Sequence, residues 1–364
     1  MENITPRRSS INITEQLLRW YDAHQRILPW RAVGRETPDP YRVWLSEIML
    51  QQTQVVTVVS YFNRFIELWP KIERLAAADV NEVLREWAGL GYYARARNLH
   101  RCAQIITRDH AGEFPKEEAD LLKLPGIGPY TAAAMAAIAF GKDATPVDGN
   151  VERVIARVYR IKTPIKENKL IIKSLASQNT PKARTGDYAQ AVMDLGATVC
   201  TPRRPLCFTC PLTELCGAFL HEETHAIPIS KKQKKAPKRE GTAYVIINTA
   251  NEILLYRRTE RGLLGGMLEV PSVGWEQDER HNELIRKLTV CRPHSKAITG
   301  TVEHVFTHFK LVLRVVVMRV EKNDWLAGLH WYSFDKIESV GLPKLMLKVV
   351  QHFLSSADNS NNPK

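Results

Sequence analysis

The chain has 364 residues, of which 44% are hydrophobic, so it is long enough to bury a sizeable core in two domains. No stretch approaches the roughly twenty consecutive apolar residues that span a bilayer, which argues against a membrane protein. A formal net charge of +12 favours a polyanionic partner, and nucleic acid is the commonest partner of this kind.

The first elements in the chain are helical. Residues 6–10 are basic but short and poorly amphipathic, and no continuous apolar core of a secretory signal follows, so we expect an untargeted intracellular protein. Residues 131–140 form an alanine-rich helical stretch, and a stripe at helical spacing follows at Val151, Val154, Ile155 and Val158.

Strand character dominates the last third of the chain. Short β-branched or aromatic runs, separated by turn-forming residues, occupy residues 243–248, 253–256, 311–320 and 331–334. We therefore predict an all-α domain over residues 1–226, a basic linker over 227–240, an α+β domain over 241–358 and a polar tail over 359–364. The densest basic run, residues 231–239, is interpreted as a solvated linker.

Residues 121–132 join two helical stretches through a Pro-Gly-x-Gly-Pro hairpin. Gly126 and Gly128 allow a tight turn and close approach to a ligand, while Pro129 suits the first position of the next helix. Free amides at that helix start would attract a phosphate. An isolated Gly-x-Gly is more typical of an ordinary helix–helix turn, and only the longer pattern is specific.

Two carboxylates are candidates for chemistry. Asp148 stands just before the helix that carries the valine stripe, where peptide amides stabilise an anion. Asn150 is an equally good cap for that helix and would leave Asp148 free for another task. Glu47 lies about 140° from the centre of an apolar stripe running from Leu45 to Val59, so periodicity alone predicts a surface glutamate.

Four cysteines fall within seventeen residues, with six, two and five residues between them: Cys200, Cys207, Cys210 and Cys216. Such a loop can hold an iron–sulfur cluster more readily than it can form disulfides, which need an oxidising compartment. Zinc sites usually show two Cys-x-x-Cys pairs, whereas this loop has one. The spacing alone leaves a zinc site open.

Together these features resemble the helix-hairpin-helix, iron–sulfur DNA glycosylases, and within them the MutY adenine-DNA glycosylases. The resemblance begins at about Leu17, runs through the cysteine loop and extends more weakly over the C-terminal domain. The matching segments are residues 28–31, 44–54, 89–99, 121–132, 146–154 and 200–216.

The resemblance implies removal of adenine mispaired with 8-oxoguanine or guanine in double-stranded DNA, which prevents G:C to T:A mutation. It assigns Glu47 as the general acid and Asp148 as the anion that stabilises positive charge at the sugar. Endonuclease III carries a Schiff-base lysine at the position of Tyr130. We therefore expect a monofunctional hydrolase that leaves an abasic site, with Tyr130 close to the sugar.

The resemblance also implies the binding residues. Gln52, Leu90 and Tyr92 match wedge residues that fill the space left by an extruded adenine. Arg26, Arg31 and Gln190 match positions around the base, although some members carry glutamate in place of Gln190. The four cysteines match the ligands of a [4Fe-4S] cluster, and Arg203 and Arg204 lie between the first two.

The C-terminal domain resembles the Nudix-like domain that recognises 8-oxoguanine in this family. Thr307 and His308 match a Phe-Ser-His segment, and threonine preserves the hydroxyl. Residues 263–272 match the start of a Nudix motif, but its metal-binding continuation is absent, so no pyrophosphohydrolase activity is expected. Cys102 and Cys291 match no ligand position and are interpreted as ordinary buried thiols.

Two rival classes oppose this prediction. An endonuclease III-like enzyme for oxidised pyrimidines is disfavoured by Tyr130 and by the C-terminal domain. A non-enzymatic DNA-binding protein would need neither Glu47 nor Asp148. We expect a monomer in a bacterial cytoplasm, associated with the nucleoid, whose abasic product passes to downstream processing enzymes.

Overall fold

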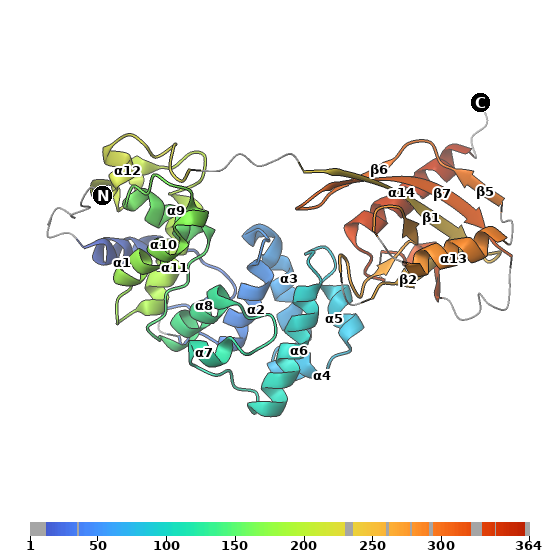
Figure 1. The fold of residues 1–364 in the computed structure, drawn as a ribbon. Coiled ribbons are helices and arrows are strands. Elements are labelled where there is room, and N and C mark those ends of the chain that lie inside the picture. Colours follow the sequence, from blue (N-terminus) through green and yellow to red (C-terminus); the bar gives the residue numbers. More distant parts are fainter. Residues whose placement is uncertain are drawn as a thin grey trace. The chain divides into compact units, whose positions relative to one another are not determined.

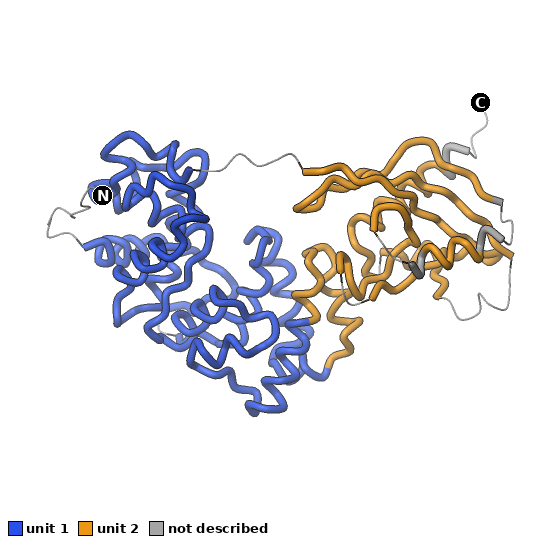
Figure 2. Tube along the Cα trace, in the orientation of Figure 1, with its two compact units in different colours: residues 1–77, 98–232 blue, residues 78–97, 233–364 orange. Residues whose placement is uncertain are grey.

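The computed structural model describes residues 12–34, 36–229, 236–259, 262–276, 279–290, 294–321, 330–338 and 340–360 (Figure 1). Cys291, residues 6–10 and residues 231–235 of the basic run lie outside these ranges. The chain divides into two compact units (Figure 2). The first comprises residues 1–77 and 98–232, and the second comprises residues 78–97 and 233–364.

The first unit is helical. Its longer helices are α1 (Ile13–His24), α2 (Pro40–Leu50), α3 (Val55–Leu68), α8 (Pro129–Phe140), α9 (Gly149–Val158), α10 (Lys169–Gln178) and α11 (Thr185–Thr198). Shorter helices are α4 (Ile72–Ala77), α7 (Glu118–Leu121) and α12 (Gly217–Leu220), and α6 (Ala94–Asp109) begins in the second unit. Single 3-10 turns occupy Ile165–Glu167, Cys207–Thr209 and Thr213–Leu215.

The valine stripe of α9 builds one core of this unit. Val151, Val154, Ile155 and Val158 are all buried and pack with apolar residues of α1, α10 and α11. The predicted helix over residues 131–140 is confirmed as α8, with Pro129 at its first position. Regular helical spacing therefore identified the elements that hold this core together.

The helix that carries Glu47 differs from the prediction. We expected one apolar stripe to continue from Leu45 to Val59, but α2 ends at Leu50 and α3 begins at Val55. Between them the backbone turns through Gln52, whose φ of 58° lies in the left-handed region. Val56, predicted as a stripe residue, is 78% exposed. The helical structure is therefore interrupted where residues 51–53 form part of the wall of a cavity.

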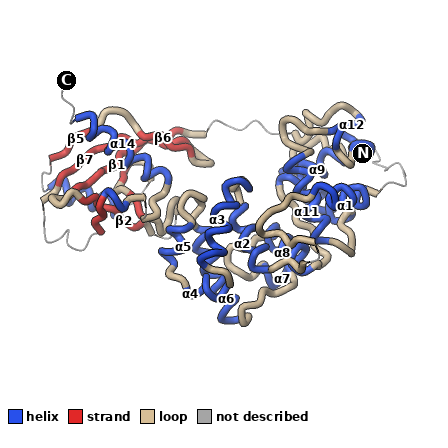
Figure 3. Tube along the Cα trace, turned by 180° about the vertical axis from the view of Figure 1, so that it is seen from behind, coloured by secondary structure: helices blue, strands red, loops and turns tan. Residues whose placement is uncertain are grey.

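The second unit is built on a sheet whose strands follow the order β3-β2-β1-β7-β5, and β4 pairs with β1, β6 with β7 and β8 with β2. Figure 3 draws the strands of this unit in red. The strands are β1 (Lys238–Ile247), β2 (Glu252–Arg257), β3 (Leu268–Glu269), β4 (Ser272–Val273), β5 (His294–Ala297), β6 (Val302–Val305), β7 (Lys310–Arg319) and β8 (His330–Ser333). The central pair β1 and β7 is parallel. All four predicted strand runs are confirmed.

Helices cover both faces of this sheet. Val245 and Ile247 of β1 pack in a core with α14 (Lys344–Ser360), whereas Ile246 between them faces a separate cluster that includes Leu284 of α13 (Glu279–Val290). This alternation follows from the two-residue period of a strand. The unit also contains α5 (Val80–Glu86) and a 3-10 turn at Phe334–Lys336. No described helix is both long enough and apolar enough to cross a membrane.

Candidate active site

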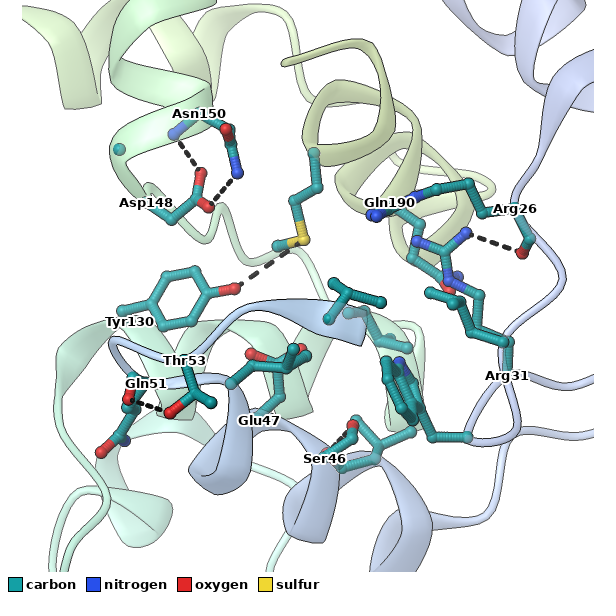
Figure 4. Close-up of a pocket in the computed structure, with 18 of the residues that line it drawn as sticks. Arg26, Arg31, Ser46, Glu47, Gln51, Thr53, Tyr130, Asp148, Asn150 and Gln190 are labelled. Atoms are coloured by element: carbon teal, nitrogen blue, oxygen red, sulfur yellow. Dashed lines mark hydrogen bonds between the residues drawn. The ribbon is translucent and has the colours of Figure 1, made fainter. Parts of the chain in front are cut away.

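A cavity of about 370 Å³ lies within the helical unit (Figure 4). Its walls come from the segment after α1, from α2 and the turn that follows it, and from α8, α9 and α11. Seven predicted site residues from distant parts of the sequence line this cavity: Arg26, Arg31, Glu47, Gln52, Tyr130, Asp148 and Gln190. The volume falls within the range of small-molecule sites.

Glu47 is buried on α2, so the surface position inferred from periodicity was wrong. Helices from elsewhere in the unit cover its polar face and turn that face into a cavity wall. Burial raises the pKa of Glu47 to about 7; Tyr130 opposes this shift, Asp148 adds to it, and Arg31 opposes it. Glu47 Oε2 has no hydrogen-bond partner among the described residues. Glu47 can therefore hold a proton near neutral pH in the wall of the cavity.

Asp148 is itself the cap of α9, which corrects the alternative that Asn150 holds that position. Its Oδ1 accepts hydrogen bonds from the backbone N–H of Asn150 and Val151 at 2.9 and 2.8 Å. Its Oδ2 accepts a third from the Asn150 side chain at 2.9 Å. Asp148 therefore both caps α9 and lines the cavity. The amides at the start of the helix orient its carboxylate and stabilise the negative charge.

Tyr130 stands at the start of α8 and projects into the same cavity (Figure 4). Its hydroxyl donates to Met193 Sδ at 3.8 Å. Burial first, and then the charges of Glu47 and Asp148, raise the pKa of Tyr130 well above its ordinary value. Tyr130 therefore acts as a neutral hydroxyl beside both carboxyl groups.

Arg26 and Arg31 share one carboxylate partner that the sequence analysis missed. Asp194 of α11 is fully buried and pairs with Arg26 Nε at 2.6 Å and with Arg31 at 2.7 Å. A signal was present, because an aspartate in the apolar run of residues 191–195 needs a cation to be buried. Gln190, one turn earlier on α11, donates to the Gly186 carbonyl at 3.3 Å.

The hairpin lies between α7 and α8. Gly126 has a φ of +78°, and an added Cβ would lie 2.9 Å from Asn98 Cβ, so this position requires glycine. Gly128 is the N-cap of α8, and an added Cβ there would meet nothing within 4 Å. The start of α8 is thus open to an approaching group.

The cysteine loop is fastened to α9 by Arg157, a second residue that the sequence analysis missed. Arg157 is buried and donates to Cys200 Sγ at 3.2 Å, to the Thr201 carbonyl at 2.8 Å and to the Ile227 carbonyl at 2.8 Å. The Arg157 guanidinium therefore holds both the first cysteine of the loop and Ile227, which follows the loop in the chain.

The four loop cysteines are free and partly buried. Burial raises the pKa of Cys210 to about 12, and the charges of Cys200, Cys216 and Cys207 add to the shift. Among the described residues, no group of three or more His, Cys, Asp or Glu side chains converges on a single ion. Cys102 is fully buried, as expected of an ordinary core thiol.

Leu90, Tyr92, Thr307 and His308 belong to the second unit. Leu90 is buried, whereas Tyr92 is 48% exposed and has a φ of 48°. Thr307 and His308 are exposed in the turn between β6 and β7, and the hydroxyls of Tyr92 and Thr307 are hydrogen-bonded to each other. This contact brings two predicted DNA-binding residues together within one unit.

An aromatic row lies beside this turn. The ring of Phe306 stacks on Trp275 with centroids 6.3 Å apart, and it lies 4.8 Å from the ring of Phe309. The guanidinium of Arg239 lies 4.2 Å from the centre of the Phe309 ring. These contacts fix the base of the turn, on which Thr307 and His308 are exposed.

The helical fold, its glycine hairpin and a cavity with two carboxylates define a DNA glycosylase of the helix-hairpin-helix class. Residues 45–181 match the HhH-GPD superfamily of base excision DNA repair proteins, and residues 242–352 match the NUDIX domain. A solved thermostable thymine-DNA glycosylase is 29% identical, with a TM-score of 0.51, and covers 57% of this chain and 95% of its own.

Two relatives, matched over more than nine-tenths of this chain, narrow the class to one family. The adenine DNA glycosylase of Homo sapiens is 34% identical over 398 residues, which cover 92% of this chain and 72% of the relative. That of Buchnera aphidicola subsp. Schizaphis graminum is 32% identical over 348 residues, which cover 93% and 98%. The chain therefore belongs to the adenine DNA glycosylase family, and the predicted resemblance and fold class are confirmed.

Proposed function

We propose that this protein removes adenine from double-stranded DNA where adenine stands opposite 8-oxoguanine or guanine, leaving an abasic site and preventing G:C to T:A mutation. The observation that carries the proposal is the unequal pair of carboxyl groups in one cavity. Glu47 is buried, with one oxygen unpartnered and a pKa of about 7, whereas Asp148 accepts three hydrogen bonds at a helix start. Such a pair suits one proton donor and one anion.

In the proposed reaction, Glu47 donates its proton to a ring nitrogen of adenine. The bond between the base and the sugar C1′ breaks, and its electron pair leaves with the neutral base. Asp148 stabilises the positive charge that remains on the sugar. Water then adds at C1′ and gives up a proton, which completes a hydrolysis.

We propose that the enzyme is monofunctional. A glycosylase that also cuts the strand needs an amine that forms a Schiff base with C1′. Tyr130 carries no amine, and the neighbouring charges disfavour its phenolate. We assign Tyr130 to packing or hydrogen bonding beside the sugar.

DNA binding supplies access to the base. We propose that the open start of α8, with Gly126 and Gly128, binds a backbone phosphate without reading sequence. Gln52, Leu90 and Tyr92 would fill the space left by the extruded adenine. Arg26, Arg31 and Gln190 line the cavity and would surround the base.

The cysteine loop fits a [4Fe-4S] cluster held by Cys200, Cys207, Cys210 and Cys216. Its thiols are free and partly buried, and a cluster binds one thiolate at each of several irons rather than four at one ion. When bound, such a cluster would order the loop rather than take part in hydrolysis. Arg203 and Arg204 would then contact phosphate.

We propose that the second unit recognises the lesion. Thr307 and His308 are exposed hydrogen-bonding groups on a turn whose base is fixed by stacked aromatic rings. A threonine hydroxyl can both donate to and accept from the oxidised base. We assign this role to the domain predicted over residues 241–358, joined by residues 227–240 to the domain predicted over residues 1–226.

Single-turnover cleavage of matched duplexes tests the proposal. The duplexes carry adenine opposite 8-oxoguanine, guanine or thymine, or an oxidised pyrimidine, and each is assayed with and without alkali. We expect breakage at adenine opposite 8-oxoguanine only after alkali. Breakage without alkali at the oxidised pyrimidine would assign an endonuclease III activity, and binding without breakage would indicate a non-enzymatic role.

A further inference from the structure

We propose that Asp194 is a positioning residue that holds Arg26 and Arg31 in the base-binding wall of the cavity and offsets the charge that Arg31 presents to Glu47. This inference rests on the proposed function, because it assigns the two arginines to the adenine. No role for Asp194 is predicted from the sequence.

The geometry of Asp194 is that of a clamp. Its Oδ1 accepts from Arg26 Nε at 2.6 Å and from Arg31 NH2 at 2.8 Å. Its Oδ2 accepts from Arg31 NH1 at 2.7 Å and from the Arg26 backbone N–H at 3.1 Å. Both oxygens are therefore fully used, and the Asp194 side chain has no exposure. Charge-assisted, two-pronged contacts of this kind are strong and directional.

The clamp joins two elements that are distant in sequence. Arg26 and Arg31 belong to the non-helical segment between α1 and α2, where the Arg31 backbone N–H donates to the Leu28 carbonyl at 3.0 Å, whereas Asp194 belongs to α11. The Arg31 side chain also donates to the Arg26 carbonyl at 3.2 Å, and this hydrogen bond links two residues of the same segment. A rigid helix thus sets the position of an irregular segment.

Asp194 does not line the cavity, although both of its partners do. Gln190 and Met193, its neighbours on α11, face the cavity, while Asp194 lies behind the arginines. The carboxylate therefore cannot contact the base and must act through the two guanidinium groups. Groups positioned in this way matter because a displacement of about 1 Å can cost about 100-fold in rate.

The clamp also sets the charge near Glu47. Arg31 lowers the pKa of Glu47, and the Asp194 carboxylate offsets the charge of Arg31. Although burial alone would raise the pKa of Asp194, Arg31 and Arg26 hold it below its ordinary value, so Asp194 stays an anion. The charged and titratable groups around Glu47 come from four elements: Arg26, Arg31, Tyr130, Asp148 and Asp194.

The test compares Asp194→Asn with Asp194→Glu in single-turnover excision of adenine over a range of pH. Asp194→Asn keeps the shape and removes the charge, so we expect a rate about 100-fold lower. Its rate should also begin to fall at a lower pH than in the unchanged protein, because an unpaired Arg31 favours ionised Glu47. Asp194→Glu should recover most of the rate and the original pH profile.

Glu223→Gln is the matched control. Glu223 also pairs with two cations, Arg160 at 2.7 Å and Lys162 at 2.8 Å, but it lies outside the cavity wall. A general loss of stability would lower the rate in both amide variants and leave the pH profile unmoved, and that result would overturn the inference. An unchanged rate in folded Asp194→Asn would overturn it as well.

A triple variant keeps the inference testable if Asp194→Asn does not fold alone, because Arg26→Gln and Arg31→Gln with Asp194→Asn replace the buried ion pairs by amides. We expect its rate to match that of the variant with Arg26→Gln and Arg31→Gln only, since Asp194 acts through these two arginines. A further large loss in the triple variant would contradict this. Absence of adenine excision by the unchanged protein would refute the proposed function instead, and the two failures are therefore distinct.

Discussion

The cavity of the helical unit and the β6–β7 turn of the second unit differ in the exposure of their polar side chains. Glu47 is buried in the cavity wall, and behind this wall Asp194 is buried in ion pairs with Arg26 and Arg31. In the turn, Thr307 and His308 are exposed, and aromatic rings support the backbone beneath them.

This difference follows from what each region is proposed to do. A proton donor needs burial, because removal from water raises the pKa of a carboxyl group toward neutral pH. Recognition of a base already displayed by DNA needs donors and acceptors that are accessible and held in place. Substitutions in the cavity should therefore change the rate of the chemical step, and substitutions in the turn should change which duplex is preferred.

The largest expected effect follows from Glu47→Gln. Glutamine keeps the shape of the side chain but cannot donate a carboxyl proton, so the single-turnover rate should fall by about 100-fold to 10,000-fold. Duplex affinity should be unchanged. The matched control is Glu152→Gln on α9, outside the cavity wall, which should keep the full rate. A folded Glu47→Gln variant with the full rate would remove Glu47 from the mechanism.

The pH profile of the unchanged protein is expected to reflect Glu47. Its pKa is raised to about 7, and the reaction uses its protonated form, so activity is present below that pH and is lost as the pH rises through it. Above it, the rate should fall about tenfold for each pH unit. Duplex binding measured over the same range separates this loss from weaker binding. A flat rate through pH ~9 would contradict the assignment.

Sequence patterns predicted the elements of both units better than the environment of the site. The valine stripe located α9, and alternating apolar runs located the strands, because these periods follow from local geometry. Glu47 was placed at the surface because a helical period describes one helix and contains no information on what packs against its polar face. The same period also gave no sign that the helix ends before Gln52, where residues 51–53 line the cavity.

Partners distant in sequence account for the remaining misses. Asp194 meets Arg26 across 168 positions, and Arg157 meets Ile227 across 70. An apolar run with a single aspartate indicates that a cation must be near, but the sequence does not say which one. Motif resemblance supplied the roles of Glu47 and Asp148, whereas the structure supplied their shared cavity.

Alanine substitutions at the two hairpin glycines should have smaller effects than Glu47→Gln, one on DNA binding and the other on stability. Gly128→Ala meets open space in the free protein, so the melting temperature should not change, but a methyl group beside the open amides should weaken duplex binding about tenfold. Gly126→Ala should instead lower the free energy of unfolding by about 1–2 kcal/mol, because its φ is +78° and Asn98 is close. Equal duplex affinity of Gly128→Ala and the unchanged protein would exclude close phosphate approach at this turn.

The smallest expected effect comes from the turn of the second unit. Thr307→Ala removes a hydroxyl that is bonded to Tyr92 and proposed to contact the oxidised base. One such hydrogen bond contributes about 0.5–1.5 kcal/mol, so the preference for 8-oxoguanine over guanine opposite adenine should fall about two- to tenfold. The ratio of the two single-turnover rates measures this preference, and Thr307→Ser, which keeps the hydroxyl, should retain it. Equal loss of rate on both duplexes would assign Thr307 to general binding, because a recognition residue changes the ratio and leaves excision opposite guanine intact.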